Sequence, residues 1–183
     1  WADELGARGF TVTRLLAAQA TKTAMLAGMR ELIGKAVAGD TVVITFSGHG
    51  TYVPDASGDE RDGLDEGLCP YDLKTGGALI DDEIHAIFAS RKGGVHLVLI
   101  SDSCHSGTVT RAVPGDDDAD LPRPRFMPMS AWLPPDRLPR AVAGKPAKAS
   151  DGESPFARAV QRGGGDLLLA GCQEGPDHFS FDA

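Results

Sequence analysis

Two short apolar runs that each end abruptly in polar residues dominate the pattern of the chain. One covers residues 42–46 and continues into Ser-Gly-His-Gly, and the other covers residues 95–100 and continues into Ser-Asp-Ser-Cys-His-Ser-Gly. Apolar runs of this length between glycines and polar residues predict buried parallel strands. Because parallel strands end at the same edge of a sheet, the two polar segments are expected to meet where α/β proteins bind their ligands.

A segment with helical spacing precedes each of these two strands. Residues 21–38 predict an amphipathic helix with Thr21 or Thr23 as its cap and Gly39 at its end, and its inward positions are Met25, Met29, Leu32, Ile33 and Ala36. A second, shorter helix is predicted from Asp81 to about Ser90, with Ile84, Ile87 and Phe88 facing inward. A strand–helix–strand order favours a parallel sheet and therefore an α/β fold.

The remaining segments give weaker patterns. Residues 11–15 predict a short strand, residues 51–80 predict an excursion with one or two β-hairpins, and residues 166–170 predict a last strand. A short helix is predicted near residues 154–161. Residues 108–152 are rich in proline and charge, which predicts a long surface loop or linker within a single domain of residues 1–183.

The composition of the chain limits the classes of binding partner and the cellular compartment that we expect. The chain has 18 basic and 26 acidic residues and a net charge of −8, which disfavours nucleic acid or an anionic membrane as partner. An odd number of cysteines, three, does not fit a disulfide framework and favours a reducing, cytoplasmic compartment. No signal peptide and no apolar stretch of membrane-spanning length is recognised. The acidic surface is compatible with a monomer and with basic substrates.

A thiol and an imidazole follow the two predicted strands. Cys104 comes just after the second strand and His49 just after the first, 55 residues earlier. A thiol becomes a strong nucleophile when a base stabilises its thiolate, and histidine exchanges protons near neutral pH. The pair therefore predicts a nucleophile, Cys104, with a general acid or base, His49. His105, adjacent in sequence, is expected to point away from the site.

The motifs SGHG, DGLDE, DDE and DSCHSG together resemble the metacaspases and bacterial orthocaspases, cysteine peptidases with a caspase-like fold. The resemblance covers residues 5–110 well and residues 165–173 weakly. It implies a three-layer sandwich whose mostly parallel sheet is flanked by helices. It also implies an oxyanion site made by the backbone amides of Gly50 and Cys104, with no cofactor required for the chemistry.

Asp102 lies two residues before Cys104, so alternation along an extended segment puts both on the same side. A carboxylate there would bind arginine or lysine of a substrate. The resemblance implies the same role, with cleavage after Arg or Lys, and Ser47 is assigned with Asp102 to substrate binding. The family's second pocket acid and its closing strand-and-helix region lie outside this chain, which leaves open whether the domain is complete at either end.

Calcium is a further implication of the resemblance, as an activator. The matching acids are Asp65, Asp81 and Asp82, whereas another family ligand falls at Arg111, a cation that would weaken the site. The alternative is that Asp81 and Asp82 begin a helix and Asp65 stabilises a turn. A zinc site made by His49 and the three cysteines Cys69, Cys104 and Cys172 has no supporting spacing, so Cys69 and Cys172 are expected to be inert.

These observations predict a cysteine endopeptidase that hydrolyses peptide bonds after Arg or Lys through a Cys-His dyad. Self-processing is expected in the 108–152 loop, with candidate sites at Arg111, Arg140, Lys145 and Lys148. The alternatives are a catalytically silent caspase-like module that binds or regulates a partner, and a related peptidase with acidic specificity, which Asp102 disfavours.

Overall fold

A computed structural model describes residues 1–55, 64–103, 125–138 and 167–170 of the chain, the last four as backbone only. A parallel sheet of three strands forms its centre, in the order β1 (Thr41–Ser47), β5 (His96–Asp102) and β6 (Leu167–Ala170). The strands predicted from the apolar runs 42–46 and 95–100 are therefore confirmed, and the strand predicted over residues 166–170 is found at residues 167–170. β1 and β5 run in register over their whole lengths, from Thr41 opposite His96 to Ser47 opposite Asp102.

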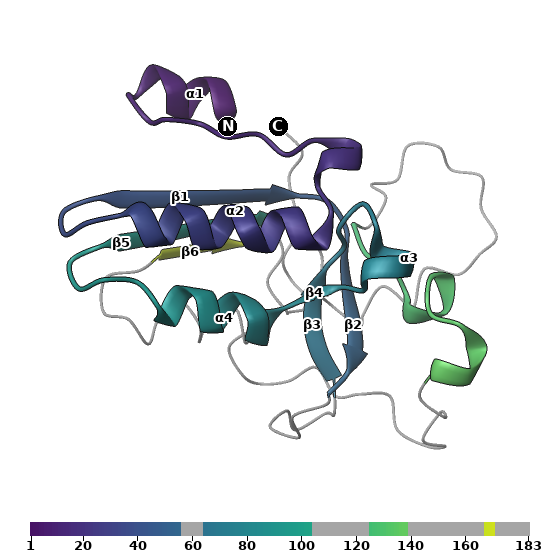
Figure 1. The fold of residues 1–183 in the computed structure, drawn as a ribbon. Helices are drawn as coiled ribbons and strands as arrows, with labels where there is room; N and C mark the ends of the chain where they lie inside the picture. Colours follow the sequence, from purple (N-terminus) through teal and green to yellow (C-terminus); the bar gives the residue numbers. More distant parts are fainter. Residues whose placement is uncertain (56–63, 104–124, 139–166, 171–183) are drawn as a thin grey trace, which may run out of the picture.

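Two helices cover one face of this sheet, α2 (Lys22–Lys35) and α4 (Asp81–Ala89), as Figure 1 shows. Their inward side chains pack on the alternate apolar positions of β1 and β5, because successive strand residues point to opposite faces. Each buried side chain of this kind contributes about 1.5–3 kcal/mol relative to exposure. The core consists mainly of Met25, Met29, Ile33, Val42, Ile44, Leu68, Leu79, Ile84, Ile87, Phe88, Leu97 and Leu99.

The ends of α2 follow from side-chain hydrogen bonds. Thr21 is the cap, since its hydroxyl accepts the N–H of Ala24 at 3.2 Å. The predicted extension to residue 38 is wrong: the carboxylate of Asp40 accepts the N–H of Val37 at 2.8 Å, which takes that donor away from the helix. Gly39, with φ of +93°, lies in the turn that follows. Leu32, predicted to face inward, is 38 % exposed.

A second, antiparallel sheet continues from the end of β1. It contains β2 (Gly50–Pro54), β3 (Leu64–Leu68) and the two-residue β4 (Leu79–Ile80), which leads directly into α4. The predicted hairpin character of residues 51–80 is confirmed, with one short helix, α3 (Leu73–Gly76), inserted between β3 and β4. An ion pair between Lys22 Nζ and Glu83 Oε2, 2.9 Å long, joins the first turns of α2 and α4.

The amino-terminal region corrects one prediction. Helix α1 (Ala2–Ala7) is followed by an extended segment and then by the 3₁₀ helix η1 (Ala17–Gln19). The strand predicted over residues 11–15 does not form. A strand needs a neighbour for its N–H and C=O groups, and in the described part of the chain the partner of β1 is β5. Leu15 and Leu16 are exposed there.

Residues 125–138 lie beside β2 (Figure 1). Phe126 forms an isolated parallel bridge with Gly50, and the 3₁₀ helices η3 (Met129–Ala131) and η4 (Pro135–Arg137) follow it. The other parts of the predicted loop, residues 108–124 and 139–152, and the predicted helix at residues 154–161 lie outside the described residues.

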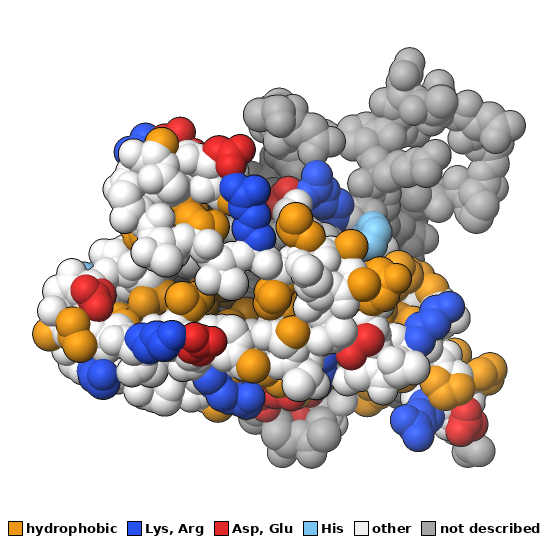
Figure 2. Space-filling model, turned by 45° about the horizontal axis from the view of Figure 1, so that its top comes forward, with side chains coloured by type: hydrophobic (Ala, Val, Ile, Leu, Met, Phe, Trp, Pro, Cys, Tyr) orange, Lys and Arg blue, Asp and Glu red, His pale blue; other side chains and the backbone are white. Residues whose placement is uncertain are grey.

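The surface mixes both signs of charge. On the face in Figure 2, basic and acidic side chains are interspersed rather than gathered into one basic patch. None of the helices in the described ranges combines the length and the apolar character that crossing a bilayer requires.

Candidate active site

The carboxyl ends of β1 and β5 bring two of the predicted site residues together. Ser47 and Asp102 are direct partners in the register of the two strands. The hydroxyl of Ser47 donates to Asp102 Oδ2 at 3.2 Å, and the N–H of Gly48 donates to the Asp102 carbonyl at 3.2 Å. The side chain of Asp102 is 43 % exposed, so its carboxylate is accessible from solvent at this edge.

His49 and Gly50 occupy the turn from β1 into β2. His49 is exposed, whereas Gly50 is buried. The N–H of Cys69, just after β3, donates to the His49 carbonyl at 2.9 Å and holds the turn against the hairpin. A Cβ atom at position 48 would lie 2.7 Å from the ring of Phe46, so a larger residue there would require that ring to shift. The SGHG motif therefore places His49, which is exposed, in the turn two residues after Ser47.

Two serines that the sequence reasoning did not select lie directly before and directly after Asp102, at the end of β5. Ser101 and Ser103 are buried, and their hydroxyl oxygens lie 2.7 Å apart. The alternation Ser-Asp-Ser was the available signal, since it turns two small polar side chains inward and Asp102 outward. Cys104 and His105 lie outside the described residues, so their predicted positions remain predictions.

Arg125 is the site residue that the sequence reasoning missed. Its Nη1 contacts Asp102 Oδ2 in an ion pair and donates to the hydroxyl of Ser47 at 2.9 Å. The site therefore already contains a guanidinium on the carboxylate predicted to bind one. The available signal was the sequence Arg-Pro-Arg-Phe at residues 123–126, within the segment interpreted as a surface loop.

Cys69 lies close to His49 through its backbone. Burial raises the pKa of the Cys69 thiol to about 12, which keeps the thiol protonated at neutral pH. This environment agrees with the expectation that Cys69 is inert. Cys172 lies outside the described residues.

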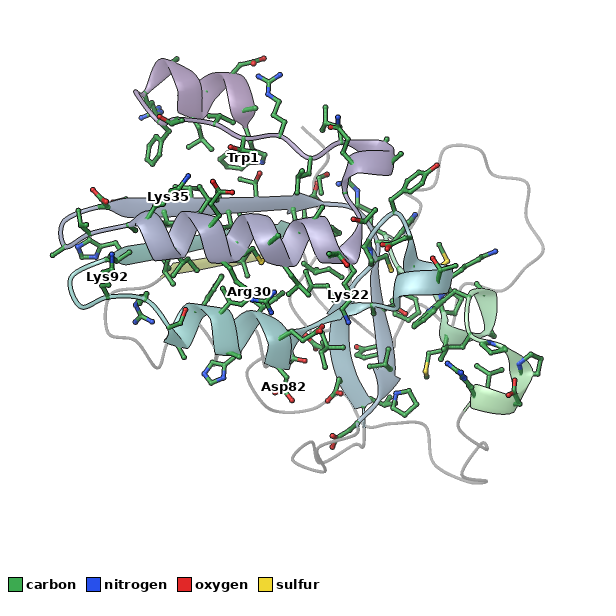
Figure 3. All side chains as sticks on the ribbon, viewed as in Figure 1. Trp1, Lys22, Arg30, Lys35, Asp82 and Lys92 are labelled. Carbon is green, nitrogen blue, oxygen red and sulfur yellow. The ribbon has the colours of Figure 1, made fainter. Side chains whose placement is uncertain are left out.

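The predicted calcium ligands do not share one environment. Asp65 on β3 and Asp81 at the start of α4 are buried, at 3 % and 6 % exposure, and buried carboxylates are usually paired or bind a metal. Asp82 is exposed, and Figure 3 shows it pointing away from the sheet at the start of α4. Within the ranges the structure describes, no three His, Cys, Asp or Glu side chains lie close enough together to hold a metal ion. Asp65, Asp81 and Asp82 are therefore not gathered into one such cluster, and Arg111 lies outside the described residues.

Comparisons with known proteins agree on one family. The sequence profile of the metacaspase peptidase C14 domain matches residues 10–113, more than half of the chain. Metacaspase-1B of Aspergillus terreus is 47% identical over 89 residues, which are 48% of this chain and 24% of that protein. Metacaspase-1 of Kluyveromyces lactis is 43% identical over 90 residues, which are 49% of this chain and 21% of that protein.

A solved structure gives the same fold. The crystal structure of a protein from Geobacter sulfurreducens superposes with a TM-score of 0.63 at 29% identity, over 94% of this chain and 61% of the other. The α/β, caspase-like fold predicted from the motifs is thereby confirmed. The matched stretch spans less than a quarter of the length of the curated relatives. With a family profile over more than half of its residues, the chain belongs to the metacaspase family, peptidase C14 domain.

Proposed function

We propose that this chain is a cysteine endopeptidase that hydrolyses peptide bonds after arginine or lysine. The observation that carries the proposal is that the guanidinium of Arg125 contacts Asp102 and Ser47 at the carboxyl ends of β5 and β1. A carboxylate with a neighbouring hydroxyl accepts charge-assisted hydrogen bonds from a guanidinium or ammonium group and would repel an acidic side chain. The substrates are therefore peptides or proteins with an exposed basic residue.

The proposed chemistry uses a thiolate and a histidine. Cys104 attacks the carbonyl carbon of the bond after the basic residue, and His49 delivers a proton to the leaving amine. The oxyanion that forms is stabilised by the N–H groups of Gly50 and Cys104. Water then hydrolyses the thioester, which restores the thiol and releases the carboxylate product. Cys104 and His49 act as a dyad in this scheme.

Short fluorogenic peptides that end in Arg, Lys or Asp test the proposal. The wild-type protein is compared with Cys104→Ala, Asp102→Asn and, as a control for a lost surface acid, Asp136→Asn in η4. We expect cleavage after Arg and Lys, none for Cys104→Ala, and a loss in kcat/KM of about 10–100-fold for Asp102→Asn, the size of a charge-assisted hydrogen bond. Asp136→Asn is expected to match the wild type.

Each part of the proposal has its own contrary outcome. Cleavage after Asp would retain the chemistry and contradict the role of Asp102. A folded protein that cleaves none of the three peptides would contradict the peptidase and favour a binding or regulatory module.

Calcium activation remains a prediction from the family resemblance, and no step of the proposed reaction depends on it. Isothermal titration with CaCl₂ measures binding directly, with Asp81→Asn compared with the wild type. Peptide hydrolysis in calcium and in chelator then measures activation. Equal rates in both, together with no binding heat, would contradict the prediction.

A further inference from the structure

The side chain of Arg125 occupies the position on Asp102 that the proposed function assigns to the basic residue of a substrate. Its guanidinium contacts Asp102 and Ser47, which end two adjacent strands, β5 and β1. Arg125 comes 23 residues after Asp102 in sequence, so this contact is made by the fold and not by local geometry. The side chain of Arg125 is 38 % exposed, which leaves part of it open to solvent at the sheet edge.

The backbone around Arg125 is held by two hydrogen bonds to Gly50. The N–H of Gly50 donates to the carbonyl of Arg125 at 2.9 Å. This amide is one of the two that the proposed mechanism uses for the oxyanion. The carbonyl of Gly50 in turn accepts the N–H of Met127 at 2.8 Å. Gly50 therefore holds the carbonyl of the bond between Arg125 and Phe126 and the N–H of Met127, on either side of Phe126.

Contacts with β2 fix the chain beyond that bond. The hydroxyl of Thr51 donates to the Met127 carbonyl at 2.7 Å, and Trp132 Nε1 donates to the same hydroxyl oxygen at 3.0 Å. The ring of Phe126 lies 5.7 Å from the ring of Tyr52, at an angle of 56°. Described side chains thus position both Arg125, through Asp102, and the residues that follow the bond.

We propose that the peptide bond between Arg125 and Phe126 is the self-processing site of this chain, cut within the same molecule. The inference rests on the proposed function and adds its first substrate. Until the cut, Arg125 also excludes other basic residues from Asp102. This site differs from Arg111, Arg140, Lys145 and Lys148, the residues that the sequence pattern suggested.

The reaction balances without any group beyond water. The thiolate of Cys104 adds to the carbonyl carbon of Arg125, and the C–N bond to Phe126 breaks. The nitrogen of Phe126 takes a proton from the imidazolium of His49 and becomes a new amino terminus. Water then attacks the thioester at Arg125, which gives a carboxylate at Arg125 and restores the Cys104 thiol.

The test follows the intact mass of the purified full chain over time, with amino-terminal sequencing of the products. We expect a fragment that begins at Phe126 in the wild type and none in Cys104→Ala. Arg125→Gln should reduce this fragment more than about tenfold, since it removes the charge-assisted contact, and Arg125→Lys should retain it. Arg123→Gln is the matched control and should be processed like the wild type.

Dilution separates a cut within one molecule from a cut between molecules. An intramolecular reaction has a rate constant that does not change with protein concentration, and we expect no change over a hundredfold dilution. A rate that falls in proportion to concentration would overturn the intramolecular assignment.

The outcomes also separate this inference from the proposed function. A chain that hydrolyses Arg peptides but stays intact, or that is cut equally well in Arg125→Gln, would overturn the inference and leave the peptidase standing. A folded chain that cleaves neither peptides nor itself would overturn both. Loss of the Phe126 fragment in Arg125→Gln, with peptide hydrolysis retained, would support both.

Discussion

The paired strands β1 and β5 have a buried apolar part along most of their length and an exposed polar part at their carboxyl ends. Along most of β1 and β5 the alternate side chains Val42, Ile44, Leu97 and Leu99 are buried under α2 and α4. At the final residue pair, Ser47 and Asp102, the strands become polar and solvent-accessible. The buried apolar part positions the polar carboxyl ends of the strands, but it contacts no predicted substrate. Substitutions in the two parts should therefore affect different measurements, stability for one and activity for the other.

The largest expected effect is on activity at the edge. His49→Ala should reduce kcat/KM on Arg peptides by about 10²–10⁴-fold, the usual contribution of general acid–base catalysis. The melting temperature should change little, because His49 is exposed. The matched control is His96→Ala, an exposed histidine at the opposite end of the sheet, on β5. Equal activity of His49→Ala and His96→Ala would contradict the assignment of catalysis to the carboxyl edge of the sheet.

The next effect is on stability in the buried apolar part. Leu99→Ala should lower the free energy of unfolding by about 2–5 kcal/mol, since it leaves a cavity beneath the helices. Urea unfolding measures this, and Val98→Ala, at the half-buried neighbouring position, should cost clearly less. A Leu99→Ala protein as stable as Val98→Ala would contradict the placement of the core.

A smaller effect is expected at the start of the covering helix. Thr21→Ala should cost about 0.5–2 kcal/mol, because the N–H of Ala24 loses its acceptor. Thr23→Ala, on the exposed face of the first turn, serves as the control and should not destabilise the protein. Thermal unfolding distinguishes the two caps that the sequence allowed, and greater damage from Thr23→Ala would contradict the assignment of Thr21.

The smallest expected effect concerns Cys69. Its N–H donates to the His49 carbonyl, and its thiol is partly buried away from solvent. Burial raises the pKa of this thiol from 9.0 to about 12, so the folded state favours the protonated form. The stability linked to this group is present below pH 9 and is lost as the pH rises toward 12. Urea midpoints at pH 8 and pH 10 should therefore fall more in the wild type than in Cys69→Ala.

Alkylation at pH 8 gives a second measurement on Cys69. Iodoacetamide should modify the Cys104 thiol and spare Cys69 in the folded protein. Peptide mapping reads both sites, and Cys69→Ala should retain wild-type hydrolysis. Rapid labelling of Cys69 would contradict its shielding.

Local rules in the sequence predicted those features whose cause is local. The spacing of Met25, Met29 and Ile33 identified the buried face of α2, and the apolar runs identified the parallel strands. The predicted end of α2 was wrong because the carboxylate of Asp40, outside the helix, accepts the N–H of Val37. Residues 11–15 have strand-like composition, but composition does not supply a hydrogen-bonding neighbour.

The candidate site was predictable in part for the same reason. Ser47 and Asp102 follow apolar runs that end at one sheet edge, so sequence order was enough to predict that they lie together. Arg125 reaches Asp102 from a segment without periodicity, and only the folded chain shows that contact. Asp65, Asp81 and Asp82 shared a motif-based assignment, yet their exposure differs because β3 and the start of α4 bury two of them and not the third.

The hydrogen bond from Trp132 to Thr51 gives the molecule an optical reporter. Thr51 is completely buried, and the half-buried indole of Trp132 donates to its hydroxyl oxygen at 3.0 Å. The chain has one other tryptophan, Trp1, which is 63 % exposed and labelled in Figure 3. Replacing Trp1 by phenylalanine would leave Trp132 as the single tryptophan, on the segment that contains Arg125. Its emission would then move to longer wavelength when residues 126–132 leave β2, so the departure of the segment could be timed in solution without any added label.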